Sequence, residues 1–92
     1  MEEKLLKIIS FYGVRPQLKH FQSEVFELNE AILDFDSGKN YAYGIEHITE
    51  EIADVMVMLE QFKLYYNISS EEITEIFWSK VDRQLKRIEE EK

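Results

Sequence analysis

Two long segments of this sequence place apolar residues three and four positions apart, and this pattern constrains the fold more than any other feature. The chain of 92 residues contains only three glycines and one proline, so few positions can interrupt a helix. No alternation of apolar and polar residues competes with the helical pattern. The sequence therefore predicts an all-α protein, and its short loops favour an antiparallel four-helix bundle.

The first two helices are bounded by the glycine and the proline near the start of the chain. A helix over residues 2–12 is expected to end at Gly13. Pro16 suits the first turn of the next helix, because the N–H that proline lacks has no partner at that position. This second helix is expected to run to about Asp36, where a polar turn begins.

The third and fourth helices are bounded by weaker signals. The apolar pattern predicts a third helix from about Tyr41 to Tyr66, with Gly44 indicating a late start. Ser69 and Glu72 have the spacing of a capping box, in which a serine side chain accepts a hydrogen bond from a backbone N–H three residues later. They are expected to open a fourth helix that continues into the acidic end of the chain.

Length and charge narrow the class of protein. Residues 1–92 suffice for one domain with one core. The 11 basic and 19 acidic residues give a net charge of −8, which argues against nucleic acid as the main partner. No apolar run is long enough to cross a membrane, and the start of the chain does not resemble a secretory signal, so a cytoplasmic location is expected. The absence of cysteine excludes thiolate metal sites.

The apolar content of 45% is high for so small a chain and predicts self-association as a dimer or tetramer. Several apolar residues lie outside the main stripes of the helices. They can serve as subunit interface or as a surface on which a base stacks, and the interface interpretation is favoured. These residues are Phe26, Leu33, Val57, Leu64, Ile73, Phe77 and Trp78.

The two central helices carry carboxylates at matched angular positions. Their apolar stripes are Leu18, Phe21, Val25, Leu28, Ile32 and Phe35, and Ile48, Ile52, Val55, Leu59, Phe62 and Tyr66. On a helical wheel, Glu24 and Glu51 lie about 70° from the centre of each stripe. Glu27 and Asp54 lie about 130° from it, on the same side. The sequence therefore places Glu-xx-Glu and Glu-xx-Asp at the shoulder of each stripe, between the core and solvent.

These carboxylates predict a site for a divalent cation, although a solvated acidic helix face would show similar spacing. Two carboxylates 4 Å apart repel by about 4 kcal/mol at an effective dielectric constant of about 20. A divalent cation removes this repulsion. Oxygen ligands without cysteine favour Mg²⁺, with Mn²⁺ as the alternative.

Each pair is preceded by a histidine one turn earlier, His20 before Glu24 and His47 before Glu51. Two histidines are too few for a typical zinc site. They are expected to contact the carboxylates from outside the ligand set, or to be ordinary surface residues.

The residues around these carboxylates resemble the sequence motifs of a known protein family. Glu24-xx-Glu27, a gap of 23 residues and Glu51-xx-Asp54 are similar to the arrangement in all-α nucleoside triphosphate pyrophosphohydrolases, which include MazG, dimeric dUTPases and phosphoribosyl-ATP pyrophosphohydrolase. Residues 48–55, Ile-Thr-Glu-Glu-Ile-Ala-Asp-Val, look like the second acidic helix of MazG-like members. Residues 22–28 resemble the first more loosely, since Ser23 stands where many members have glutamate.

The resemblance implies a MazG-like bundle completed by self-association, and cleavage of a nucleoside triphosphate between its α- and β-phosphates. The products are a monophosphate and pyrophosphate, and the expected role is removal of unwanted nucleotides. Mg²⁺ would be held by Glu24, Glu27, Glu51 and Asp54. One of these, or Glu50, would act on the attacking water. Lys80 and then Arg83 are the expected contacts to substrate phosphate. The alternative is a non-catalytic helical oligomer that acts as an adaptor or regulator.

Overall fold

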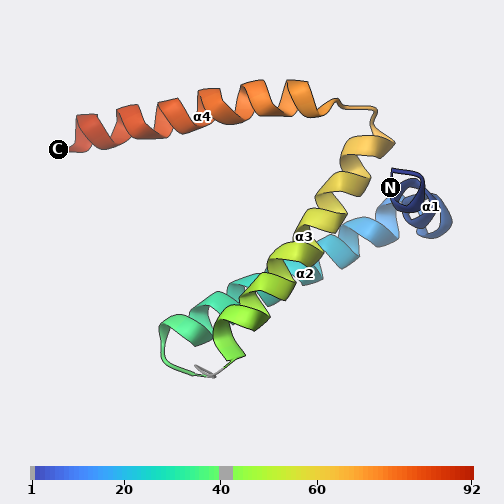
Figure 1. Ribbon diagram of the computed structural model, residues 1–92, viewed down its shortest axis with the longest axis horizontal. Helices are drawn as coiled ribbons and strands as arrows, with labels where there is room; N and C mark the ends of the chain where they lie inside the picture. The colour runs from blue at the N-terminus through green and yellow to red at the C-terminus, as the bar shows by residue number, and fades with distance from the viewer. Residues whose placement is uncertain (1, 40–42) are drawn as a thin grey trace.

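The computed structural model describes residues 2–39 and 43–92, and every regular element in these ranges is a helix. This confirms the all-α prediction and the expected number of helices. Three of them, α1, α2 and α3, pack together, while α4 extends away from them (Figure 1). The helices are α1 (Glu2–Tyr12), α2 (Val14–Asp36), α3 (Gly44–Tyr65) and α4 (Ser70–Glu91).

The helix ends lie close to the predicted positions. Gly13 has φ 90°, a conformation that favours glycine, and separates α1 from α2. Ser69 caps α4, where its hydroxyl oxygen accepts a 3.1 Å hydrogen bond from the backbone N–H of Glu72. The late start indicated for the third helix is confirmed, since α3 begins at Gly44. The predicted start at Tyr41 lies outside the described residues.

The buried seam between α2 and α3 is rotated relative to the predicted apolar stripes. Five stripe residues are exposed, namely Leu18, Ile32, Ile52, Leu59 and Tyr66. Most of the shielded positions follow a spacing of four and three residues, which keeps half of the stripe residues and adds polar or small ones: Gln17, Phe21, Glu24, Leu28, Ala31 and Phe35 on α2, and Gly44, Ile48, Glu51, Val55, Met58 and Phe62 on α3. This is the spacing of two helices that cross at a shallow angle. The rotation carries Glu24 and Glu51 from the shoulder into the seam itself.

The close approach of α2 and α3 at their connected ends depends on Gly44. A β-carbon at this position would overlap the ring of Phe35 on α2. At the other end of the seam, the ring of Phe21 meets that of Phe62 edge to face, with centroids 5.6 Å apart. α1 crosses this end and buries Ile9. The acidic residues of the seam therefore lie between two packed apolar ends.

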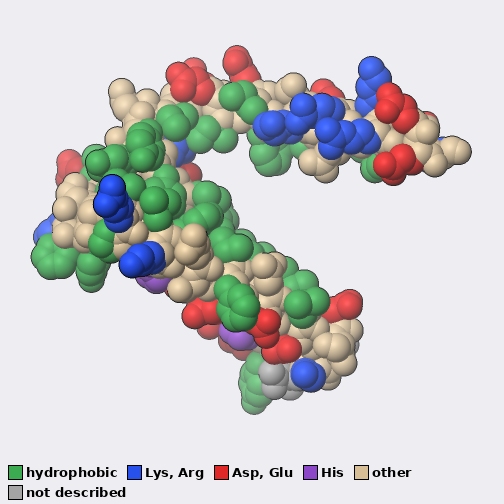
Figure 2. Space-filling model, turned by 180° about the vertical axis from the view of Figure 1, so that it is seen from behind, with side chains coloured by type: hydrophobic (Ala, Val, Ile, Leu, Met, Phe, Trp, Pro, Cys, Tyr) green, Lys and Arg blue, Asp and Glu red, His purple; other side chains and the backbone are tan. Residues whose placement is uncertain are grey.

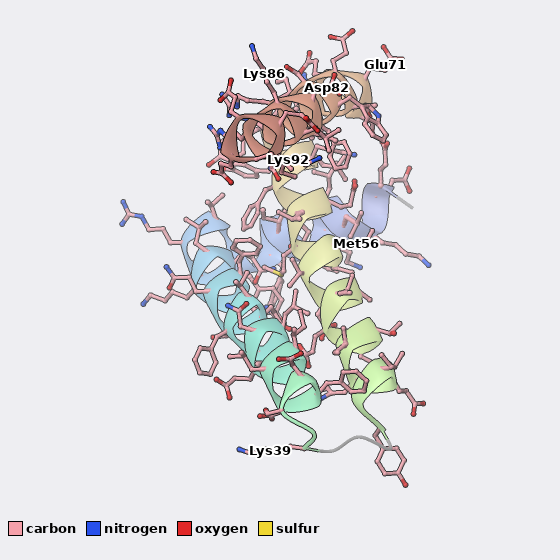
Figure 3. All side chains as sticks on the ribbon, turned by 90° about the vertical axis from the view of Figure 1, so that its left-hand side faces the viewer. Lys39, Met56, Glu71, Asp82, Lys86 and Lys92 are labelled. Atoms are coloured by element: carbon pink, nitrogen blue, oxygen red, sulfur yellow. The ribbon has the colours of Figure 1, made fainter. Side chains whose placement is uncertain are left out.

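α4 is an arm rather than the fourth member of a bundle within one chain. All its residues are exposed except Val81, which is half-buried. Figure 3 shows the arm standing clear of α1–α3, with Lys86 pointing away from them. The radius of gyration is 16.4 Å, whereas a compact domain of this length has about 12 Å. Among the described residues, no helix is both long and apolar enough to cross a membrane.

Candidate metal centre

Three carboxylates from the two central helices meet at the middle of the seam. Glu24 on α2 and Glu51 and Asp54 on α3 each offer an oxygen, and these oxygens lie within 4.8 Å of one another. The packing of α2 against α3 brings the two acidic turns side by side, which the matched phases on the wheel did not by themselves determine. A helix–helix site of this kind has the carboxylate ligands and the size for a divalent cation.

Burial distinguishes the two glutamates of this group from a solvated acidic face, whereas Asp54 is exposed. The side chains of Glu24 and Glu51 are only 13% and 11% exposed. The Oε2 atom of each is fully buried and has no hydrogen-bond partner among the described residues. A buried carboxylate oxygen without a partner is costly, because it has lost its water and gained nothing in return. A bound cation would supply the missing partner for both.

The two histidines take equivalent positions on the two helices. His20 Nε2 lies 2.9 Å from Glu24 Oε1, and His47 Nε2 lies 3.3 Å from Glu51 Oε1. On the face shown in Figure 2, histidine side chains (purple) lie beside acidic ones (red). Each histidine is about half exposed and holds one oxygen of its glutamate, leaving the other for the centre of the group. Contacts of this kind orient the ligands of a metal site.

The surroundings of Glu24 shift the pKa of its carboxyl group. Burial raises the pKa of its carboxyl group, and the charges of Asp54 and Glu27 raise the pKa further. The hydrogen bond with His20 acts in the opposite direction and lowers the pKa, but burial and the like charges prevail. Glu24 therefore resists ionisation in the folded protein unless positive charge is placed beside it.

The remaining predicted site residues lie outside this group. Glu27 is exposed, one turn from Glu24, and lines a shallow hollow with Lys19 and Phe26. Glu50 is also exposed. The roles predicted for both remain predictions.

Lys80 and Arg83 lie on the arm α4, where they border a hollow with Glu75. In Figure 2, Lys and Arg side chains (blue) gather along this arm. Neither residue lines the cavity beside the carboxylates within one chain. Phosphate contact by these residues therefore remains a prediction.

The carboxylates open into a cavity that the sequence did not reveal. Its volume is about 490 Å³, and Glu24, Asp54 and His20 lie along its wall. Its other residues include Gln17 and Gln61, which are almost fully buried. Gln17 lies seven residues before Glu24, so it falls on the same helix face. In the sequence, the signal that could have indicated this cavity was a polar residue two helical turns before a predicted metal ligand.

No known protein family, curated protein or solved structure matches this chain.

Proposed function

We propose that this protein is a MazG-like, Mg²⁺-dependent nucleotide pyrophosphohydrolase. One observation carries the proposal: two buried glutamate oxygens without a partner, Glu24 Oε2 and Glu51 Oε2, belong to a group completed by Asp54. Such a group is unfavourable by itself and becomes favourable with a hard divalent cation in its centre. The resemblance of residues 22–28 and 48–55 to the acidic helices of these enzymes supports the same assignment.

The proposed reaction is hydrolysis between the α- and β-phosphates. The oxygen of water bonds to the α-phosphorus, and the bond from that phosphorus to the bridging oxygen breaks with its electron pair leaving on pyrophosphate. Glu24, Glu51 and Asp54, with Glu27 as the fourth proposed ligand, would hold the cation, which would neutralise charge at the phosphate oxygens. A carboxylate of the site, or Glu50, takes the proton that the water loses. Lys80 and Arg83 would contact phosphate from α4.

The arm α4 supports self-association as part of this proposal. A folded monomer of this length exposes about 5,700 Å², whereas this chain exposes 7844 Å². The excess of about 2,100 Å² per chain, or about 4,200 Å² for two copies, lies within the range of about 2,000–5,000 Å² in total that obligate homodimers bury. An isolated helix is marginal in water, yet α4 exposes six large apolar side chains: Ile73, Ile76, Phe77, Trp78, Leu85 and Ile88.

A second copy is the proposed cover for this surface. A hollow of about 660 Å³ between α3 and α4 is lined by Met56, Leu59, Phe62, Ile73 and Phe77. Met56 projects from α3 on the side away from α2 (Figure 3). A dimer, or a tetramer made of two dimers, would fill this hollow with apolar side chains of its partner and place one arm of α4 near the other copy.

Nucleotide turnover tests the enzymatic proposal directly. The full chain is incubated with each NTP and dNTP and with Mg²⁺, and pyrophosphate release is measured. Activity toward at least one nucleotide is expected, with Glu51→Gln and Asp54→Asn lowering kcat by about 100-fold or more. Glu30→Gln, an exposed change on α2, is the matched control and should retain activity. Absence of turnover for every nucleotide would contradict the proposal.

The exposed arm also suits a different class of protein, a non-catalytic helical oligomer that acts as an adaptor or regulator. This alternative predicts association without turnover. It also predicts that Mg²⁺ leaves the melting temperature of the protein unchanged, because no cation would then be held by the folded state.

A further inference from the structure

The cavity beside the carboxylates extends from the metal centre to α1. It is bordered by Tyr12 of α1, Pro16 and Gln17 of α2, and Val57, Met58 and Gln61 of α3, in addition to Glu24 and Asp54. Its volume of about 490 Å³ lies within the range of about 300–1,000 Å³ typical of small-molecule sites. Such sites combine apolar walls with a few fixed polar groups. Here the walls are apolar and aromatic, and the polar groups lie at two separate ends.

The end remote from the carboxylates is formed by a buried pair of amides. Gln17 Nε2 donates a 2.8 Å hydrogen bond to Gln61 Oε1, which joins α2 to α3. Gln61 is 1% exposed and Gln17 is 4% exposed. Gln61 Nε2 contacts the sulfur of Met58 at 3.9 Å, a weak acceptor. Each amide thus has its place fixed by the other.

This amide pair retains hydrogen-bonding capacity that the protein does not use. Gln17 Oε1 accepts no hydrogen bond from any described residue, and Gln17 lines the cavity. A glutamine has two donor hydrogens and one acceptor oxygen, and a buried amide seldom leaves such groups unpaired. The pair therefore offers a fixed donor and acceptor edge to a molecule in the cavity.

The spacing of the two ends matches one class of ligand. Gln17 precedes Glu24 by seven residues, which separates them by roughly 10 Å along the helix axis. A nucleotide whose phosphates lie at the carboxylates would extend its base to about this depth. Bare polyphosphate would leave the apolar walls and the amides without contact.

We propose that this cavity is the base-recognition site, in which Gln17 and Gln61 read the hydrogen-bonding edge of a nucleobase held between Tyr12, Pro16 and Val57. The proposal rests on the proposed pyrophosphohydrolase function and adds the part of the substrate that the carboxylates do not contact. It makes the amide pair, rather than the exposed aromatic residues of α2 and α4, the determinant of base preference.

The test compares two properties of the protein. One is its discrimination between nucleotides that differ in their base, and the other is its hydrolysis of inorganic triphosphate, which contains no base. The ratio of kcat/KM between the best and the worst nucleotide is measured for the wild type, for Q17M/Q61M and for Val57→Phe, beside hydrolysis of inorganic triphosphate. Replacing both amides by side chains of similar shape preserves the packing. Val57 is 43% exposed, so its enlargement narrows the cavity without affecting the core. Gln22→Met, on the exposed face of α2, is the matched control.

The wild type is expected to prefer one base over another by more than about tenfold, because a hydrogen-bonding site rejects bases that leave its groups unpaired. Q17M/Q61M should reduce this ratio to less than about threefold. Val57→Phe should lower nucleotide turnover at least about tenfold, whereas inorganic triphosphate hydrolysis stays at the level of wild type and Gln22→Met. An undiminished ratio in Q17M/Q61M would overturn the proposal while leaving the hydrolase function intact.

A binding measurement tests base recognition independently of hydrolysis. Nucleoside monophosphates are titrated into the full chain while the side-chain amide signals of Gln17, Gln61 and Gln22 are followed by NMR. Saturable shifts of Gln17 and Gln61 alone would support base recognition even if no nucleotide is hydrolysed. Unchanged signals for both residues, with or without turnover, would overturn it.

Discussion

The carboxylates of Glu24 and Glu51 lie within 4.8 Å of each other, and each glutamate buries an oxygen that has no partner among the described residues. The two residues occupy equivalent positions on α2 and α3 and each contacts a histidine one turn earlier. The seam between the helices therefore contains two buried carboxylate oxygens that lack a partner.

Mg²⁺ is expected to stabilise the folded protein against heat. A cation that binds only the folded state adds about 2.7 kcal/mol at a concentration 100 times its dissociation constant. Glu51→Gln should remove most of this gain. It should also raise the stability of the metal-free protein by about 1 kcal/mol, because an amide N–H can bond the neighbouring carboxylates. Circular dichroism melts with and without Mg²⁺ measure both effects, and a wild-type melt insensitive to Mg²⁺ would contradict the metal site.

Stability without metal is expected to fall as the pH rises. Burial, with the charges of Asp54 and Glu27, raises the pKa of Glu24 in the folded state. The folded chain therefore binds a proton that the unfolded chain releases, and this advantage disappears as the pH rises above about 4.5 through the raised pKa. Urea unfolding at several pH values should show the decline in wild type and a smaller one in Glu24→Gln. If stability fell equally steeply with pH in the two proteins, this prediction would be contradicted.

Gly44→Ala should destabilise the protein by about 1–3 kcal/mol, the usual cost of overpacking. The added β-carbon would overlap the ring of Phe35 and force α2 and α3 apart near the metal centre. Urea unfolding of Gly44→Ala and of the double variant with Phe35→Leu tests the cause. The smaller side chain should recover part of the loss, and a loss that is simply additive would mean that the contact with Phe35 is not its cause.

The hydrogen bond between Gln17 and Gln61 predicts strong coupling between the two positions. Gln61→Met alone leaves a nearly buried Gln17 amide without its partner, which should cost about 1–3 kcal/mol. The double variant Q17M/Q61M should be less destabilised than the sum of the two single variants. A double-mutant cycle in urea gives the coupling energy, and a value near zero would mean that the bond contributes little.

Trp78 provides a reporter of association because it is the single tryptophan and lies on the exposed face of α4. If a second copy covers this face, dilution should shift its emission to longer wavelength as the assembly dissociates. Ile76→Asp, on the same arm, should give the monomer at all concentrations, since a charge in an apolar interface is costly. Analytical ultracentrifugation checks the masses, and a wild-type monomer at high concentration would contradict the dimer.

Much of the local structure was predictable from the sequence because local chemistry determines it. Gly13 separates α1 from α2, and the Ser69 hydroxyl caps α4 as the spacing to Glu72 predicted. The pairing of His20 with Glu24 is also a local effect, since residues four apart lie on adjacent turns of a helix. None of these features requires knowledge of what the helices pack against.

The sequence by itself thus determined four helices and the acidic turns that carry Glu24, Glu51 and Asp54. Only the tertiary structure decided which faces are buried. Packing of α2 on α3 rotated the seam to one side of the apolar stripe, so that Glu51 is buried while Ile52 and Leu59 are exposed. It also joined Gln17 to Gln61 and left α4 apart. The reason is physical: a helix fixes the angles between its own side chains, whereas the rotation and crossing of two helices depend on the fit of both surfaces together.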